Sequence, residues 1–213
     1  MVLHGYWRSS AAYRVRIALN LKQISYRQVS YHLRDGAQRH PEFLARNPQG
    51  LVPALEVDDG KFLTQSLAII EYLEETYPVA PLLPVTAQAK ARVRSIALAI
   101  ACDLHPLNNL RVLNFLGTQY GQNDAGKTAW YQHWVRCELD ALENRLSQES
   151  ETGKFCHGNT VTLADVCLIP QLYNARRWNC DMSAYQTLLR IETSCLSLDA
   201  FSKAAPEGQP DSE

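Results

Sequence analysis

The fold of this chain is decided by residues 7–16, which read WRSSAAYRVR. The apolar run before them, residues 2–6, predicts a strand, and the spacing of Val15 and Leu19 predicts a helix over residues 11–22. The serine pair therefore lies at a strand-to-helix turn, where the first amide groups of the helix lack internal partners and the helix dipole is positive. A serine at such a turn can simply cap the helix, or the turn can hold an anion such as a thiolate.

The composition indicates a globular protein with one large core or two small ones, because 46% of its 213 residues are hydrophobic. With a net charge of -1, the chain has no excess of basic residues that would indicate binding to nucleic acid or to an anionic membrane surface. No apolar run is long enough to span a bilayer, and the first residues lack the layout of a signal peptide. The six cysteines are scattered without a C-x-x-C pair, so we expect reduced thiols, a cytoplasmic protein and no metal site.

Residues 1–80 predict a mixed α/β domain in the order β-α-β, an irregular link, then β-β-α. After the first strand and helix, the expected elements are a β-rich run over 26–33, a short helix over 41–46, a hairpin of 53–57 with 61–64, and a helix over 66–77. Ser66 is the expected cap of that last helix.

Prolines punctuate a linker over residues 81–87, and residues 88–213 then read as helical without a strand pattern. Thr162 followed by Asp165 resembles a capping box. The polar residues 206–213 are expected to be frayed. One helix face is predicted from four apolar positions: Val135, Leu139, Leu142 and Leu146.

Three features of the first domain together describe a groove for a short anionic peptide that carries a thiol, which is glutathione. The first is the serine-pair turn. The second is the Val52–Pro53 bond: a cis form would turn the Val52 backbone outward to pair with a peptide, whereas the ordinary alternative is a proline at a strand start. The third is Gln65-Ser66, which can clamp a carboxylate at a helix N-terminus or serve only as a cap.

Several segments resemble the zeta-class glutathione transferases, and the match covers nearly the whole chain. They are residues 14–19 (RVRIAL), 47–55 (NPQGLVPAL), 65–74 (QSLAIIEYLE), 105–111 (HPLNNLR) and 162–171 (TLADVCLIPQ). The serine-pair segment and the 65–74 run are specific to the class, whereas the Val-Pro and cap elements occur across all glutathione transferases. The resemblance implies a glutathione transferase fold and a homodimer. This fold is an α/β thioredoxin-like N-terminal domain that binds glutathione, followed by an all-α C-terminal domain that binds substrate.

The resemblance also assigns roles to positions of this chain. Ser9 matches the serine that stabilises the glutathione thiolate, with Ser10 beside it. Contacts to glutathione map to Gln49, Val52, Gln65 and Ser66, and a further contact in the loop over 35–41 maps to Gln38 or His40. In the helical domain, His105, Asn109 and Arg111 align with glutathione or substrate contacts, and Arg177 matches a position that can face a substrate carboxylate.

Many zeta-class proteins carry a cysteine directly after the serine pair, whereas this chain has Ala11. Glutathione must then supply the only sulfur nucleophile at the turn. The resemblance implies cis–trans isomerisation of maleylacetoacetate to fumarylacetoacetate in tyrosine and phenylalanine catabolism, with maleylpyruvate isomerisation in gentisate catabolism as the alternative. A general conjugating or dehalogenating transferase and a non-enzymatic binding or regulatory protein of the same fold are the other hypotheses.

The expected chemistry needs cations as well as a thiolate, because the substrates are dicarboxylates and an enolate develops during the reaction. Arg8 directly precedes the active turn, so its proximity follows from the sequence. Arg111 and Arg177 are the other candidates, and the alternative for each is a solvated surface charge. His105 either contacts the ligands directly or is a partly buried, hydrogen-bonded histidine.

Overall fold

The computed structural model describes residues 1–213, which form two compact units. Unit 1 comprises Met1–Pro81 together with Ser197–Glu213, and unit 2 comprises Leu82–Leu196. This division differs from the expected one at its far end, because the last segment of the chain folds with the first unit and not with the helical one.

Unit 1 is built on a four-stranded sheet in the order β2-β1-β3-β4. Strand β1 is parallel to β2 and antiparallel to β3, and β3 is antiparallel to β4. The chain order confirms the predicted β-α-β, link, β-β-α arrangement. The elements are β1 (Val2–Gly5), α1 (Ser10–Leu21), β2 (Arg27–Ser30), η1 (Ala37–Arg39), α2 (Pro41–Leu44), β3 (Ala54–Glu56), β4 (Phe62–Thr64), α3 (Ser66–Thr76), α10 (Asp199–Ser202) and η3 (Pro206–Gly208).

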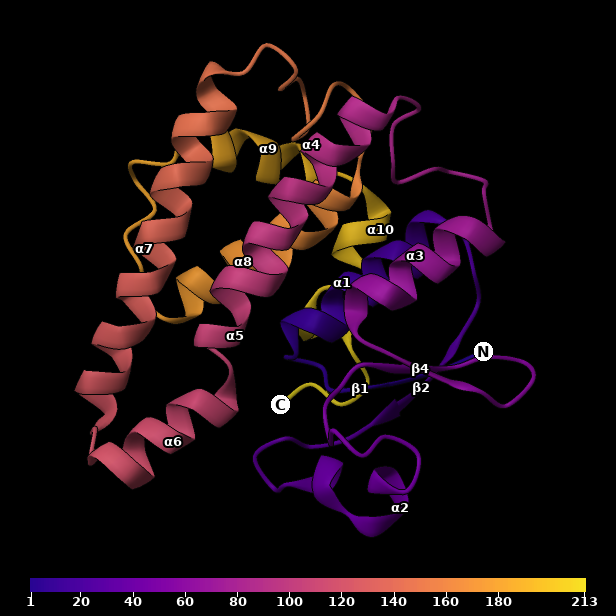
Figure 1. Cartoon of the computed structure of the whole chain (residues 1–213), viewed down its shortest axis with the longest axis vertical. Helices are drawn as coiled ribbons and strands as arrows, with labels where there is room; N and C mark the ends of the chain where they lie inside the picture. Colours follow the sequence, from indigo (N-terminus) through magenta and orange to yellow (C-terminus); the bar gives the residue numbers. More distant parts are fainter. The chain divides into compact units, whose positions relative to one another are not determined.

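Side chains alternate between the two faces of the sheet, which sets where the helices pack. Leu3 and Leu55 lie opposite each other on β1 and β3, and both are fully buried. His4 points to the other face, where its ring lies 6.4 Å from that of Phe43 in α2 and 4.6 Å from that of Phe62. Figure 1 shows α1 and α3 together on one side of the sheet and α2 on the other.

The C-terminal segment of unit 1 packs along α1, and the expectation that residues 206–213 are frayed is wrong. Phe201 of α10 is fully buried, and the Asn20 amide donates to the Ala200 carbonyl at 3.1 Å. Gln209 is also buried and donates to two backbone carbonyls of the same segment. The polar side chains that predicted fraying instead satisfy backbone groups.

Unit 2 is all-helical, as the sequence predicts, and its most buried helix is α8, where twelve of fifteen residues are buried. Such burial on every side is typical of a central core helix. The predicted apolar face of α7 is confirmed, since its four positions are all buried. No helix of the chain combines the length and the apolar character that crossing a membrane requires. The elements are α4 (Ala87–Leu98), the π-helical stretch η2 (Ala99–Leu104), α5 (His105–Leu107), α6 (Leu110–Tyr120), α7 (Asp124–Gln148), α8 (Leu163–Arg177) and α9 (Gln186–Leu196).

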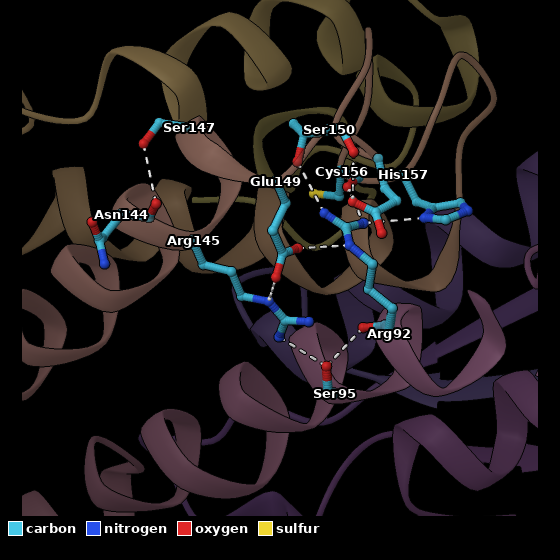
Figure 2. Close-up of polar contacts among 11 residues, drawn as sticks. Arg92, Ser95, Asn144, Arg145, Ser147, Glu149, Ser150, Cys156 and His157 are labelled. Carbon is cyan, nitrogen blue, oxygen red and sulfur yellow. Dashed lines mark hydrogen bonds and ion pairs between the residues drawn. The ribbon is translucent and has the colours of Figure 1, made fainter. Parts of the chain in front are cut away.

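Arg92, whose side chain is 9% exposed, ties the loop after α7 to α4 (Figure 2). The Arg92 guanidinium donates to the Glu149 carboxylate at 2.7 Å, to the Thr152 hydroxyl at 2.9 Å and to the Cys156 carbonyl at 2.8 Å. Its Nη1 also lies 3.1 Å from Nδ1 of His157. One side chain thus fixes most of the loop that leads to α8.

The start of α8 confirms the predicted capping box. The Asp165 carboxylate is fully buried and accepts from the Thr162 backbone N–H at 2.8 Å and from its hydroxyl at 3.0 Å. It also accepts from the Cys156 N–H at 2.8 Å, so the capping box connects the loop held by Arg92 with the central helix.

Candidate active site

Ser9 is the N-cap of α1, and the helix begins at Ser10, one residue before its predicted start. The Ser9 hydroxyl oxygen accepts from the Ala12 N–H at 3.2 Å, and the Ser9 N–H donates to the Tyr6 carbonyl at 3.0 Å. A hydroxyl that accepts through its oxygen can still donate its proton, so capping and anion binding are compatible at this position. Ser9 is partly exposed whereas Ser10 is buried, which makes Ser9 the more accessible of the two.

Arg8 places a cation directly before the Ser9 turn. Its guanidinium carbon lies 5.0 Å from the centre of the Trp7 ring and 6.0 Å from that of the Tyr6 ring. Cation–π contacts of this kind are worth about 0.5–1 kcal/mol at exposed sites and restrain the side chain. Arg8 is partly exposed, so its charge is held at the turn where an anion can reach it.

The side chains of Gln49 and Gln65 contact each other, although the two residues are 16 positions apart in the sequence. The Gln65 amide donates to Oε1 of Gln49 at 3.0 Å, and both residues are exposed. Buried Asn47 shapes the turn that carries Gln49: its side chain donates to the Leu51 carbonyl at 2.8 Å and accepts from the Gln49 N–H at 3.2 Å.

The N-terminus of α3 differs from the expectation, because the cap is Gln65 and Ser66 is the first helical residue. The Gln65 side chain makes no capping hydrogen bond, and its φ of 68° is uncommon for a residue other than glycine. Backbone strain of this type is concentrated at ligand sites. Ser66 is buried, and its hydroxyl accepts from the Arg14 guanidinium at 3.4 Å.

The other predicted glutathione contacts of unit 1 lie in the segment between β2 and β3. The Val52–Pro53 peptide bond is cis. Gln38 lies in η1 and is partly buried, and its Oε1 is a buried acceptor without a hydrogen-bond partner. His40 is exposed at the residue before α2.

The candidates of unit 2 lie at helix ends. His105 begins α5 directly after the π-helical stretch, and Asn109 caps α6 by accepting from the Arg111 N–H at 3.1 Å. Arg111 is exposed. Arg177 ends α8, where its guanidinium donates to the Asn174 side chain at 3.3 Å and lies 5.9 Å from the Trp178 ring centre.

Three consecutive residues of α7 anchor both groups of unit 2 candidates, and the sequence analysis missed them. The Trp130 indole donates to the Leu107 carbonyl at 2.9 Å. The Tyr131 ring stacks on Trp178 at 4.4 Å, and the Gln132 amide donates to the Trp178 carbonyl at 2.8 Å. The signal that could have indicated them is the dense aromatic run WYQHW over residues 130–134.

The sequence analysis also assigned no role to Arg14 or Arg16, which are almost completely buried on α1. Arg14 contacts Ser66, so it links the first turns of α1 with the start of α3. Two arginines within an otherwise apolar helix were the available signal, because arginine is rarely buried without a specific partner.

No cysteine lies in unit 1, and none of the six forms a disulfide. Burial raises the pKa of the Cys156 and Cys195 thiols, which keeps both protonated and unreactive. Ala11 lies in the first turn of α1, so no protein thiol is present at this turn. A sulfur nucleophile at this turn must therefore come from a bound molecule.

Comparison with known proteins identifies the family of this chain. Residues 3–81 match the family model for the glutathione S-transferase N-terminal domain. A probable maleylacetoacetate isomerase from Vibrio cholerae is 49% identical and covers 99% of this chain and 98% of its own. The crystal structure of maleylacetoacetate isomerase from Methylobacterium extorquens AM1 with bound malonate and glutathione is 47% identical, with a TM-score of 0.98 and full coverage of both chains. The holo structure of a bacterial zeta-class maleylpyruvate isomerase is 43% identical, also with a TM-score of 0.98 and full coverage of both chains. The chain therefore belongs to the zeta-class glutathione transferases, in the family of the maleylacetoacetate and maleylpyruvate isomerases.

Proposed function

We propose that this protein is a glutathione-dependent cis–trans isomerase that converts maleylacetoacetate to fumarylacetoacetate. The observation that carries the proposal is the turn before α1, where the Ser9 hydroxyl caps the helix, the Arg8 cation lies beside it and Ala11 replaces a protein thiol. The names of full-length relatives support the same reaction.

Bound glutathione supplies the thiolate that adds to the conjugated double bond, so that the resulting single bond can rotate before elimination restores a trans double bond. A free thiol has a pKa near ~8.5, so only a few per cent is ionised at neutral pH. Ser9 raises that fraction because its hydroxyl donates a hydrogen bond to the thiolate sulfur, and the N-terminus of α1 adds its positive dipole. Ser10 supports the same turn as the first residue of the helix.

The glutathione peptide is held by a second part of unit 1, at the N-terminus of α3 and in the turn that carries Gln49. Gln65 and Ser66 bind a carboxylate at the uncapped N-terminus of α3, and Gln49 is in place beside them through its bond to Gln65. The Val52 backbone pairs with the peptide. Gln38 is a better candidate than His40 for the remaining contact, because a ligand donor would satisfy its orphaned buried oxygen.

Unit 2 supplies the substrate side of the reaction. Arg111 and Arg177 of this unit, like Arg8 of unit 1, are the residues proposed to bind substrate carboxylates, because guanidinium–carboxylate pairs are strong and directional. Asn109 orients Arg111 through its cap, and His105 contacts glutathione or substrate at the start of α5.

The test is to assay maleylacetoacetate and maleylpyruvate with and without glutathione, and to count free thiol over many turnovers. We expect turnover only with glutathione and no net loss of thiol. Stoichiometric loss of thiol would indicate a conjugating transferase instead. Faster turnover of maleylpyruvate would assign the second candidate, which the 43% identical maleylpyruvate isomerase structure supports.

The biological setting follows from the same proposal. The enzyme acts as a cytoplasmic homodimer in tyrosine and phenylalanine catabolism, with unit 1 as the thioredoxin-like glutathione-binding part and unit 2 as the substrate-binding part. Light scattering at micromolar concentration tests the dimer, and a monomer that retains full activity would contradict it.

A further inference from the structure

Both backbone polar groups of Trp7, two residues before Ser9, are bound by charged side chains. The Trp7 N–H donates to Oδ2 of Asp211 at 3.0 Å. The Trp7 carbonyl accepts from Nη2 of Arg16 at 2.9 Å. Hydrogen bonds to charged partners are the stronger ones, so this short stretch of backbone is restrained at both groups.

Arg16 reaches from the turn to the C-terminal segment. Its side chain is completely buried, and its Nε donates to the Ala204 carbonyl at 2.9 Å while Nη1 lies 3.5 Å from the Tyr6 carbonyl. Burial lowers the pKa of Arg16 to about 10, and the guanidinium stays charged at neutral pH. Burying the Arg16 cation costs desolvation free energy, and its guanidinium donates only to backbone carbonyls. We infer that this residue serves to hold those carbonyls in position.

Asp211 is held in place independently of the turn. Its Oδ1 accepts from the Gln28 amide of β2 at 3.0 Å. Two residues earlier, Gln209 donates to the Lys203 carbonyl at 3.1 Å and to the Ala205 carbonyl at 2.8 Å, which fixes the backbone of the segment. The carboxylate therefore acts from a rigid support and is not carried on a mobile tail.

We propose that Arg16 and Asp211 are positioning residues that lock the Trp7 backbone and thereby place the Ser9 hydroxyl for its work on the glutathione sulfur. The link to Ser9 is short, because the Ser9 N–H bonds back to the Tyr6 carbonyl within the same turn. A displacement of about 1 Å at a reacting group can cost a large factor in rate, so a turn fixed at both Trp7 groups favours catalysis. This inference rests on the proposed role of Ser9.

The test compares Asp211→Ala, Asp211→Asn and the control Ser212→Ala. Asparagine keeps an acceptor for the Trp7 N–H, and the Gln28 amide can turn its oxygen toward the new donor. Ser212 is exposed, and its hydroxyl contacts only the Glu207 carbonyl, so it reports a change in the segment without a link to the turn. The readouts are kcat, KM for glutathione, the Kd of S-methylglutathione, and the pKa of bound glutathione from thiolate absorbance near 240 nm.

For Asp211→Ala we expect kcat to fall about ten-fold and the pKa of bound glutathione to rise, with KM and the S-methylglutathione Kd within about two-fold of wild type. Asp211→Asn should recover most of kcat, and Ser212→Ala should match wild type. Unchanged kcat and thiol pKa in Asp211→Ala would overturn the proposal.

A purely structural role would also overturn the proposal. It would appear as a loss of activity in Asp211→Ala that equals the loss of S-methylglutathione binding sites, with the thiol pKa of the remaining sites unchanged. Failure of the proposed function is distinguishable, because wild-type protein would then isomerise neither maleyl compound while the pKa of bound glutathione still tests the effect of Asp211.

Discussion

Replacing Ser9 with alanine removes a hydroxyl that has two separable effects. The first is on stability, because the oxygen accepts the Ala12 N–H at 3.2 Å as the cap of α1. Loss of a serine cap costs about 0.5–2 kcal/mol, with a typical value near 1. For a chain of this length, each kcal/mol lowers Tm by about 2–4 °C, so the expected fall is only a few degrees.

The second effect of Ser9→Ala is on turnover and is much larger. Removing one donor to a catalytic anion costs on the order of 10²–10³ in rate in other enzymes. The affinity for glutathione should change little, because Gln49, Gln65 and Ser66 remain in place at the other end of the peptide. Steady-state kcat and KM with maleylacetoacetate, together with a thermal melt, measure both effects on the same preparation.

Thr86→Ala is the matched control, since Thr86 caps α4 by accepting the Ala89 N–H at the same distance of 3.2 Å. It should lose similar stability and keep its turnover. Ser9→Thr retains the hydroxyl and should recover part of kcat. The reasoning is refuted if Ser9→Ala loses no more turnover than Thr86→Ala, in which case Ser9 only caps the helix and Ser10 becomes the candidate.

Three further outcomes are expected. Arg8→Ala should lower kcat/KM for the dianionic substrate roughly ten- to a hundred-fold and spare a neutral electrophile, with partial rescue by lysine; equal losses on both substrates would make Arg8 structural. Arg92→Ala, which breaks the Arg92–Glu149 ion pair (Figure 2), should destabilise the protein by about 2–3 kcal/mol in denaturant unfolding. This loss lies below the range for a fully buried pair because the Glu149 side chain is one-third exposed. Lys90→Ala, on the same helix, should cost little, and equal losses would contradict this role. Burial alone would raise the pKa of Glu149, but hydrogen bonds from Arg145 and Arg92 outweigh it and lower the pKa below its usual 4.5. The stabilisation that ionised Glu149 contributes is therefore complete above its usual pKa and is lost as pH falls through its lowered pKa in the folded protein. Between about pH 6 and 3, Tm should fall less in Glu149→Gln than in wild type. Parallel curves of Tm against pH for the two proteins would exclude the effect.

Local sequence patterns were sufficient to predict the order of the helices and strands and to locate much of the candidate site. The strand-to-helix turn at Ser9, the apolar face of α7 and the Thr162–Asp165 capping box were all predicted and are all present. Each depends on residues within about four positions of one another, so backbone periodicity and capping chemistry record it directly in the sequence. The resemblance to a family added the roles of particular residues, which periodicity alone does not contain.

Long-range contacts could not be read in the same way. Asp211 and Trp7 are 204 positions apart, and the polar composition around Asp211 predicts a frayed end whether or not a partner exists. Burial of Arg16 likewise depends on the Ala204 carbonyl, which only the folded C-terminal segment brings to α1. The sequence by itself therefore determined the order of the elements, the capping box of α8 and the location of Ser9 at a helix N-terminus. The tertiary structure alone decided which distant groups satisfy the buried charges and backbone of that turn, because a polar residue's partner is set by where the chain returns in space.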